Sequence, residues 1–260
     1  MMLHAIEAGS GPPVALLHGL FGAARNFGAV QRRLAERFRV VALDLRNHGA
    51  SPHDADASYA AMAADVLETL AALGAPRAAL VGHSMGGKVA MTVALLRPEA
   101  VFRLLVADIA PVRYEPHFRS FAEAMRALPL TPGLTRAEAS AALAPAVPDP
   151  AMRAFLLQNL DHGAQPAWRV GLDELAAALP DIEGWNSRPG ASYPGPALVL
   201  SGARSDYVQP EHRPLFRALF PAVRFATLRD AGHWLHADQP EAFTATAAAF
   251  LEGLTSPSAA

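Results

Sequence analysis

The stretch Val81-Gly82-His83-Ser84-Met85-Gly86-Gly87-Lys88 contains the pattern Gly-x-Ser-x-Gly. The run before it, 78–81, is short and apolar and predicts a buried strand, whereas the residues after it favour a helix. A strand that turns sharply into a helix at one residue holds that residue in a strained conformation and exposes its side chain at the carboxyl edge of a sheet. This nucleophile-elbow pattern makes Ser84 the candidate nucleophile.

The glycines of this stretch permit two further interpretations. Side chains at Gly82 and Gly86 would collide where strand and helix pass closely, which favours the elbow. The spacing of Gly82 and Gly87-Lys88 also nearly matches a phosphate-binding loop, but Val89 stands where that loop needs Ser or Thr. We therefore disfavour a nucleotide site. The other motifs must separate the elbow from a glycine-rich turn that only lets a helix pack.

The composition limits the class of protein. The chain has 260 residues, 52% of them hydrophobic and 18% charged, which suits one globular α/β domain with an insertion. A net charge of −2 gives no indication of nucleic-acid or membrane partners. The absence of cysteine excludes disulfides and thiolate metal sites and fits a reducing compartment. The N-terminus has no signal-peptide pattern and no stretch is apolar enough to span a membrane, so we expect a cytoplasmic protein.

Strands and helices are expected to alternate at both ends of the chain. The expected strands are 2–8, 14–17, 38–43, 78–81, 102–107, 197–202 and 223–228, and the expected helices are 26–36, 58–73, 88–96, 210–219 and 240–251, with a frayed end rich in Ser, Pro and Ala. This alternation predicts a mostly parallel sheet with helices on both faces, whose ligands bind beyond the carboxyl ends of the strands. His18, Asp44, Ser84 and Asp108 follow such ends.

The alternation breaks in the middle of the chain. Residues 113–195 predict a run of short amphipathic helices and no convincing strand. The helices are expected at 116–128, 135–144, 149–160 and 170–179, separated by prolines such as Pro180. We expect a core formed by residues 1–112 and 196–260, with 113–195 inserted as a helical cap.

Ser84 needs partners if it is a nucleophile. A serine hydroxyl requires a base to remove its proton, and a histidine requires a carboxylate to fix its tautomer. His233 lies in the loop after the last expected strand and is the candidate base. The loop after the first long strand and the residue after the nucleophile supply the oxyanion hole in this type of site. The backbone N–H groups of Leu20 and Met85 are the candidates, with Phe21 as an alternative to Leu20.

Together these motifs resemble the α/β-hydrolases and, more narrowly, the small bacterial esterases of the YbfF type. The matching segments are His18–Gly22, Asp44–Gly49, Gly82–Lys88, Asp108–Val112 and Gly232–Trp234. The resemblance extends over essentially the full chain. It implies the α/β-hydrolase fold and hydrolysis of acyl esters and thioesters.

The carboxylate that completes the site has two candidates. In most α/β-hydrolases it follows the strand after the cap, but this position holds Ser205, and Asp206 lies one place later. Neighbouring residues of an extended loop point in different directions, so Asp206 is expected to face away from His233. Asp108 follows the strand after the nucleophile helix, and the segment Asp-Ile-Ala-Pro resembles the YbfF-type esterases there. We assign the acid to Asp108, with Ser205 as an accessory hydrogen-bond donor.

The remaining aromatic and titratable residues have simpler interpretations. Phe21 and Trp234 are candidates for the walls of a substrate pocket. His233 and His236 could form a metal pair, but no carboxylate or thiolate accompanies them at ligand spacing, so no metal site is expected. Lys88, one turn into the nucleophile helix, is expected to be a structural anchor.

We therefore expect a cofactor-free serine esterase or thioesterase that forms an acyl-enzyme, acts on a small-molecule acyl ester and exists as a monomer or small homo-oligomer. A perhydrolase or acyltransferase would use the same three residues with a different acyl acceptor. A non-catalytic small-molecule receptor on a hydrolase scaffold is the alternative from another class.

Overall fold

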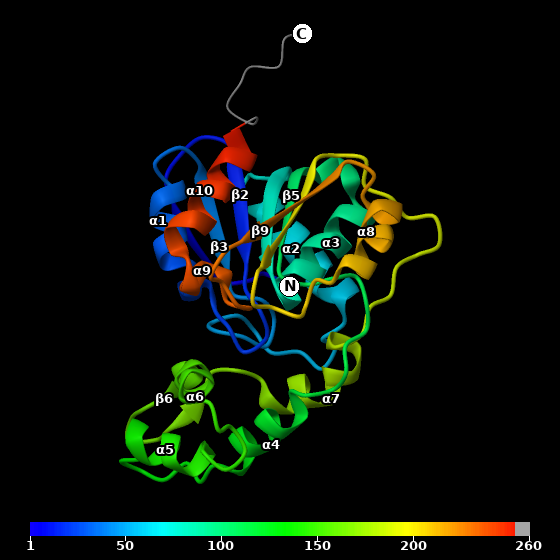
Figure 1. The fold of residues 1–260 in the computed structure, drawn as a ribbon. Helices are drawn as coiled ribbons and strands as arrows, with labels where there is room; N and C mark the ends of the chain where they lie inside the picture. The colour runs from blue at the N-terminus through cyan, green and yellow to red at the C-terminus, as the bar shows by residue number, and fades with distance from the viewer. Residues whose placement is uncertain (253–260) are drawn as a thin grey trace.

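A seven-stranded sheet forms the centre of the molecule, for which the computed structural model describes residues 1–252 (Figure 1). The strand order is β1-β3-β2-β4-β5-β8-β9, with β1 antiparallel to β3 and every other pair parallel. The strands are β1 (Ala5–Ala8), β2 (Pro13–Leu17), β3 (Arg39–Leu43), β4 (Ala78–His83), β5 (Val101–Ala107), β8 (Ala197–Gly202) and β9 (Val223–Leu228). The expected frayed end falls in residues 253–260, outside the described part of the chain.

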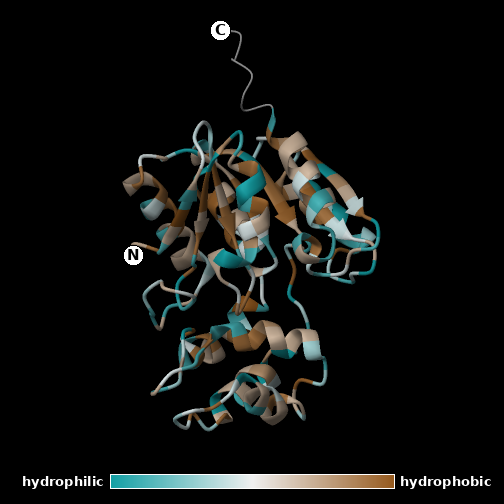
Figure 2. Cartoon of the chain, turned by 90° about the vertical axis from the view of Figure 1, so that its left-hand side faces the viewer, coloured by the Kyte–Doolittle hydropathy of each residue, from teal (hydrophilic) through white to brown (hydrophobic). Residues whose placement is uncertain are grey.

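Helices cover both faces of this sheet. They are η1 (Ala24–Phe27), α1 (Gly28–Leu34), α2 (Tyr59–Ala72), α3 (Met85–Leu96), η2 (Pro98–Ala100), η4 (Pro210–His212), α8 (Arg213–Leu219), α9 (Leu235–Asp238) and α10 (Pro240–Leu251). Alternate residues of β2 point to opposite faces: Val14 and Leu16 belong to the core cluster that includes α1 and α10, whereas Ala15 and Leu17 belong to the one that includes α2 and α3. Both faces are buried, which explains why the central strands are continuous apolar runs (Figure 2).

Local signals set several helix ends. Ser58 caps α2, because its Oγ accepts a hydrogen bond from the Ala61 N–H at 3.2 Å. Gly74 follows this helix with φ of 72°, a conformation that glycine adopts without strain. The helix after the elbow begins at Met85, directly after Ser84, rather than at residue 88 as the sequence suggested.

Residues 113–195 are here called the helical insertion, and their helices lie beyond the carboxyl ends of the strands (Figure 1). They contain α4 (Arg119–Ala127), α5 (Arg136–Leu143), α6 (Pro150–Leu156), η3 (Leu157–Asn159) and α7 (Leu172–Ile182). Two features differ from the expectation. The two-residue strands β6 (Leu160–Asp161) and β7 (Ala167–Trp168) pair antiparallel, and they are too short to leave a pattern in the sequence.

The helix α7 also continues past Pro180 instead of ending before it. Proline removes one backbone donor near the end of the helix, and two basic side chains supply partners for the carbonyl groups there. Arg113 Nη1 donates to the Pro180 carbonyl at 2.9 Å, and Lys88 Nζ donates to the Gly184 carbonyl at 2.5 Å. In the described part of the chain, residues 1–252, no helix is both long and apolar enough to cross a membrane.

Lys88 anchors the helical insertion to the sheet layer. Its ammonium group also approaches the carbonyls of Ile182 and Glu183, at 3.4 and 3.2 Å, where α7 ends. A cation is favoured at a helix C-terminus, because the carbonyl groups there carry partial negative charge. The side chain is only 1% exposed, and this burial lowers the pKa of Lys88 to about 7.

The buried ammonium predicts a pH dependence of stability. Between pH 7 and 10.5, the unfolded chain keeps the Lys88 proton that the folded chain releases, so the free energy of unfolding should rise with pH, by at most about 1.4 kcal/mol per pH unit. In Lys88→Met, the part of this rise in the free energy of unfolding that comes from Lys88 should be absent. The measurement is urea unfolding of both proteins at several pH values in this window, and superimposable pH profiles would refute the prediction.

Candidate active site

Ser84 stands at the turn from β4 into α3, with φ of 53° and ψ of −124°. This is a strained conformation for a residue with a side chain. A Cβ at Gly82 would meet the Gly86 carbonyl, and a Cβ at Gly86 would meet the carbonyl of Leu17 on the neighbouring strand. The glycines therefore permit the close passage that places Ser84 at the edge of the sheet, as the sequence predicted.

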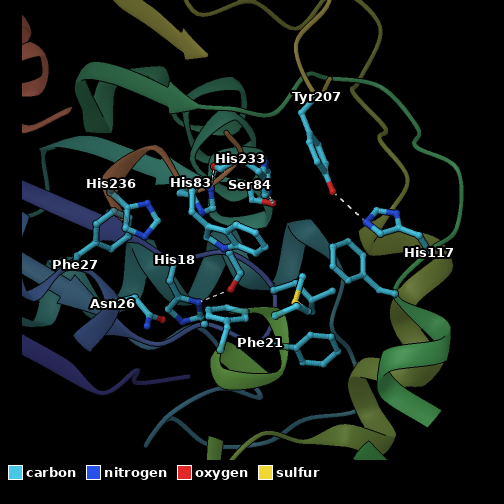
Figure 3. Close-up of a pocket in the computed structure, with 17 residues that line it drawn as sticks. His18, Phe21, Asn26, Phe27, His83, Ser84, His117, Tyr207, His233 and His236 are labelled. Carbon is cyan, nitrogen blue, oxygen red and sulfur yellow. Dashed lines mark hydrogen bonds between the residues drawn. The ribbon is translucent and has the colours of Figure 1, made fainter. Parts of the chain in front are cut away.

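The structure brings Ser84, His233 and Asp108 together in one hydrogen-bonded chain. Figure 3 shows the first two of these residues, Ser84 and His233, at the wall of a cavity. His233 Nε2 lies 3.0 Å from Ser84 Oγ, and its Nδ1 lies 2.8 Å from Asp108 Oδ2. The carboxylate accepts from Nδ1, so Nδ1 carries the proton and the Nε2 lone pair faces the serine hydroxyl. A base is thus within reach of the Ser84 proton.

Asp108 is fully buried at the end of β5, and it is held by more than His233. Its Oδ1 accepts a hydrogen bond from the Gly202 N–H at 3.1 Å, and its Oδ2 accepts a short one from Ser205 Oγ. Asp206 is exposed, and among residues 1–252 its carboxylate makes no hydrogen bond to His233. The geometry therefore places Asp108 and Ser205, rather than Asp206, beside the imidazole.

Two neighbouring rings fix His233 in place. His83 Nε2 lies 2.7 Å from the His233 carbonyl oxygen, to which it donates. The Tyr207 ring stacks on the imidazole, with centroids 3.9 Å apart and planes 20° apart. The sequence gave no signal for the stacking of Tyr207, because this contact joins two loops that follow different strands.

The loop after β2 lies directly against the elbow. A Cβ at Gly19 would come within 3.1 Å of the Ser84 Cβ. Among residues 1–252, neither the Leu20 N–H nor the Met85 N–H donates a hydrogen bond to protein. The Phe21 N–H, the alternative to Leu20, already donates to His48 Nε2 at 3.1 Å. Leu20 and Met85 are therefore the backbone donors left available beside Ser84.

A cavity of about 210 Å³ opens in front of Ser84. Phe21 and Trp234, the expected pocket residues, both line it. Phe21 is labelled in Figure 3. The helical insertion contributes Phe118, Met152 and Phe155 to its walls. The cavity wall is mainly apolar, with a few polar groups such as Ser84, His233 and Tyr207, which suits an uncharged acyl group.

Several other histidines surround the site, and burial lowers their pKa values. The pKa of His48 falls to about 3 and that of His236 to about 4, and burial also lowers the pKa values of His18 and His83. These rings are neutral at pH 7 and act as hydrogen-bonding or packing groups. In residues 1–252, no group of three or more His, Cys, Asp or Glu side chains is arranged to hold a metal ion.

Comparison with known proteins gives consistent matches over nearly the whole chain. A model of the Alpha/beta hydrolase family matches residues 14–246. The sn-1-specific diacylglycerol lipase ABHD11 of Mus musculus is 42% identical over 249 residues, covering 92% of this chain and 81% of the relative. Esterase YbfF of Escherichia coli K12 is 37% identical over 232 residues, covering 88% and 89%. A probable alcohol acetyltransferase of Saccharomyces cerevisiae is 34% identical over 256 residues, covering 88% and 74%.

Solved structures give the same match. A marine microorganism esterase superposes with a TM-score of 0.92 at 34% identity, covering 96% of this chain and 99% of its own. A thermophilic esterase from Thermogutta terrifontis superposes with a TM-score of 0.75 at 25% identity, covering 98% and 94%.

The hydrogen bonds of Asp108 predict a ranking of two variants. Asp108→Asn should lower kcat by about 10⁴, because an amide no longer holds the imidazole in the productive tautomer. Asp206→Asn is the matched control and should keep most of the activity, since Asp206 is exposed and makes no hydrogen bond to His233. Steady-state hydrolysis of an aryl ester checks both, after equal thermal midpoints show that they fold. The reverse order would move the acid to Asp206.

Proposed function

Since the chain belongs to the α/β-hydrolase family, we propose that it is a serine esterase or thioesterase that cleaves small acyl esters or thioesters through an acyl-enzyme on Ser84. The esterases and lipases among its relatives make it a hydrolase of carboxylic esters. One observation carries the finer proposal: Ser84, His233 and Asp108 form a continuous hydrogen-bonded chain at the wall of an apolar cavity.

In the first half of the reaction, Ser84 Oγ attacks the acyl carbonyl carbon while His233 Nε2 takes the hydroxyl proton. The carbonyl oxygen becomes an oxyanion, for which the Leu20 and Met85 N–H groups are the proposed donors. The imidazolium is stabilised by Asp108 Oδ2. It then gives its proton to the leaving oxygen or sulfur, the bond to that atom breaks, and the acyl group stays on Ser84.

In the second half, water replaces the alcohol. His233 Nε2 takes a proton from water, whose oxygen attacks the acyl-enzyme carbonyl. Collapse of the second tetrahedral intermediate returns the proton to Ser84 Oγ and releases the carboxylic acid. No cofactor is required in either half. Ser205 acts indirectly, because its hydrogen bond holds the Asp108 carboxylate against the imidazole.

The helical insertion, residues 113–195, is proposed to act as a cap over the site, with residues 1–112 and 196–260 as the catalytic core. Three of its apolar side chains, Phe118, Met152 and Phe155, face the cavity opposite the elbow. A volume of about 210 Å³ is smaller than that of pockets for drug-sized ligands, which supports acyl groups of short to medium length.

A second candidate function is acyl transfer to an alcohol. The acyl-enzyme is the same, and an alcohol instead of water attacks it. This possibility is favoured by one observation, the 34% identity to a probable alcohol acetyltransferase over 88% of this chain. Adding increasing ethanol to an aryl-ester assay separates the two: a hydrolase yields mainly free acid, whereas a transferase yields mainly the ethyl ester.

The nucleophile assignment is tested by removing one oxygen atom. Ser84→Ala should lower kcat for aryl esters by about 10⁶, because the covalent route is lost. A fluorophosphonate should label the wild-type protein and leave Ser84→Ala unlabelled. Ser201→Ala is a control, since the Ser201 hydroxyl is hydrogen-bonded to Thr227 on the neighbouring strand and not to His233. Full activity in Ser84→Ala would overturn the assignment, and a folded wild-type protein that neither reacts nor labels would favour the non-catalytic receptor.

A further inference from the structure

The backbone of Phe21 has a strained conformation that neighbouring groups must hold in place. Phe21 has φ of 58°, in the left-handed region that residues with side chains rarely adopt, at a cost on the order of 1 kcal/mol. Phe21 directly follows Leu20, one of the two proposed oxyanion donors, and its ring is 1% exposed. The orientation of the Leu20 N–H therefore depends on how the Phe21 residue is held.

Two side chains hold Phe21 at its backbone polar groups. Its N–H donates to His48 Nε2 at 3.1 Å, and its carbonyl oxygen accepts from Asn159 Nδ2 at 2.7 Å. Both side chains are buried, His48 fully and Asn159 with 1% exposure. A hydrogen bond in a site without water is stronger than at the surface, and loss of either partner leaves a buried backbone group unsatisfied.

His48 is fixed as an acceptor. Its Nδ1 lies 2.9 Å from the Arg46 carbonyl oxygen, which can only accept, so Nδ1 carries the proton and Nε2 presents a lone pair to Phe21. The ring packs edge-on against His18, with centroids 4.9 Å apart. Burial keeps the pKa of His48 at about 3, so the ring stays a neutral acceptor over the whole neutral range.

Asn159 reaches Phe21 from the helical insertion. Asn159 is the last residue of η3 and lies 138 positions after Phe21 in the chain. The preceding residue, Gln158, accepts hydrogen bonds from two residues of η1, which follows the loop after β2: its backbone carbonyl accepts from Arg25, and its Oε1 accepts from Asn26 Nδ2 at 2.9 Å. The insertion thus contacts Phe21 and η1 through two consecutive residues, of which Asn159 is the one that bonds to Phe21.

We propose that Asn159 and His48 are positioning residues of the oxyanion hole: they hold the Phe21 backbone from both sides and so leave the Leu20 N–H free for the substrate oxygen. The proposal rests on the serine esterase function proposed above. It makes the helical insertion part of the catalytic machinery, because one of the two supports comes from it. Displacement of the insertion from the core would weaken the hole as well as open the cavity.

The first test compares two neighbouring residues of η3. Asn159→Ala removes the support of the Phe21 carbonyl, and Gln158→Ala removes a bond to Asn26 without touching Phe21. Removal of a whole oxyanion donor costs about 10²–10³ in kcat, so a displaced donor should cost about 10- to 100-fold. We expect this loss in Asn159→Ala with unchanged KM, and less than about threefold loss in Gln158→Ala.

A second measurement separates positioning from general loosening of the fold. Ser84 Oγ bonds to the boron atom of phenylboronic acid, and the tetrahedral boronate that results places one of its oxygens in the oxyanion hole. Its inhibition constant should rise in Asn159→Ala by the same factor by which kcat falls, at an unchanged thermal midpoint. A purely structural role would lower the midpoint and leave the two factors unrelated.

A third comparison approaches Phe21 from the other side. His48→Phe keeps a ring but removes the acceptor of the Phe21 N–H, whereas His48→Gln can place its amide oxygen near the position of Nε2. The phenylalanine variant should show the same parallel loss of kcat and boronate affinity, and the glutamine variant should recover most of both. This pair also decides the matter if Asn159→Ala does not fold.

The outcomes distinguish this inference from the function on which it rests. An active wild-type enzyme whose Asn159→Ala and His48→Phe variants keep kcat and boronate affinity would overturn the positioning role alone. A folded wild-type protein that neither hydrolyses esters nor binds the boronate would overturn both proposals.

Discussion

The close passage of β4 and α3 at Ser84 is the constraint on which the rest of the site depends. There is no room for a side chain at Gly82 or Gly86, because the turn, the helix and the neighbouring strand β2 pass so closely there. Because the backbone is held this tightly, the strained φ of 53° at Ser84 persists and the hydroxyl stays at the carboxyl edge of the sheet. The parallel strands then bring the loops that follow them to the same edge, where Asp108 and His233 meet the serine.

Charge is concentrated in very few groups around this hydroxyl. The neighbouring histidines have pKa values lowered by burial, so they donate and accept hydrogen bonds as neutral rings. An imidazolium formed on His233 would therefore have Asp108 as its ionic partner and no competing cation from these rings. The buried hydrogen bonds to Asp108 from Gly202 and Ser205 hold the carboxylate in place against the imidazole.

Features that depend on local sequence were predictable. The apolar runs predicted the central strands of the sheet. The comparisons confirm the expected α/β-hydrolase fold and family. The elbow pattern gave the site of Ser84. The choice of Asp108 over Asp206 drew on a resemblance as well as on side-chain direction, and its catalytic role stays a prediction.

Features that depend on long-range contacts were not predictable. Asn159 and Phe21 lie 138 positions apart, and neither residue type signals a hydrogen bond between them. The stacking of Tyr207 on His233 arises in the same way, from two separate loops. The two short strands of the helical insertion have too few residues for any periodicity. In each case the information lies in the packing of distant segments rather than in a local pattern.

If Ser84 carries the acyl group during turnover, the sequence allows this intermediate to be observed directly. Lys88 is the only lysine, and trypsin cleavage after Arg77 and Lys88 releases a short peptide, 78–88, that carries the elbow serine as its only hydroxyl residue. The protein is mixed with an aryl acyl ester, quenched in acid during turnover and analysed by mass spectrometry. We expect an acyl adduct on Ser84 of this peptide. An enzyme that turns over the ester while its acyl adduct lies on another peptide would contradict it.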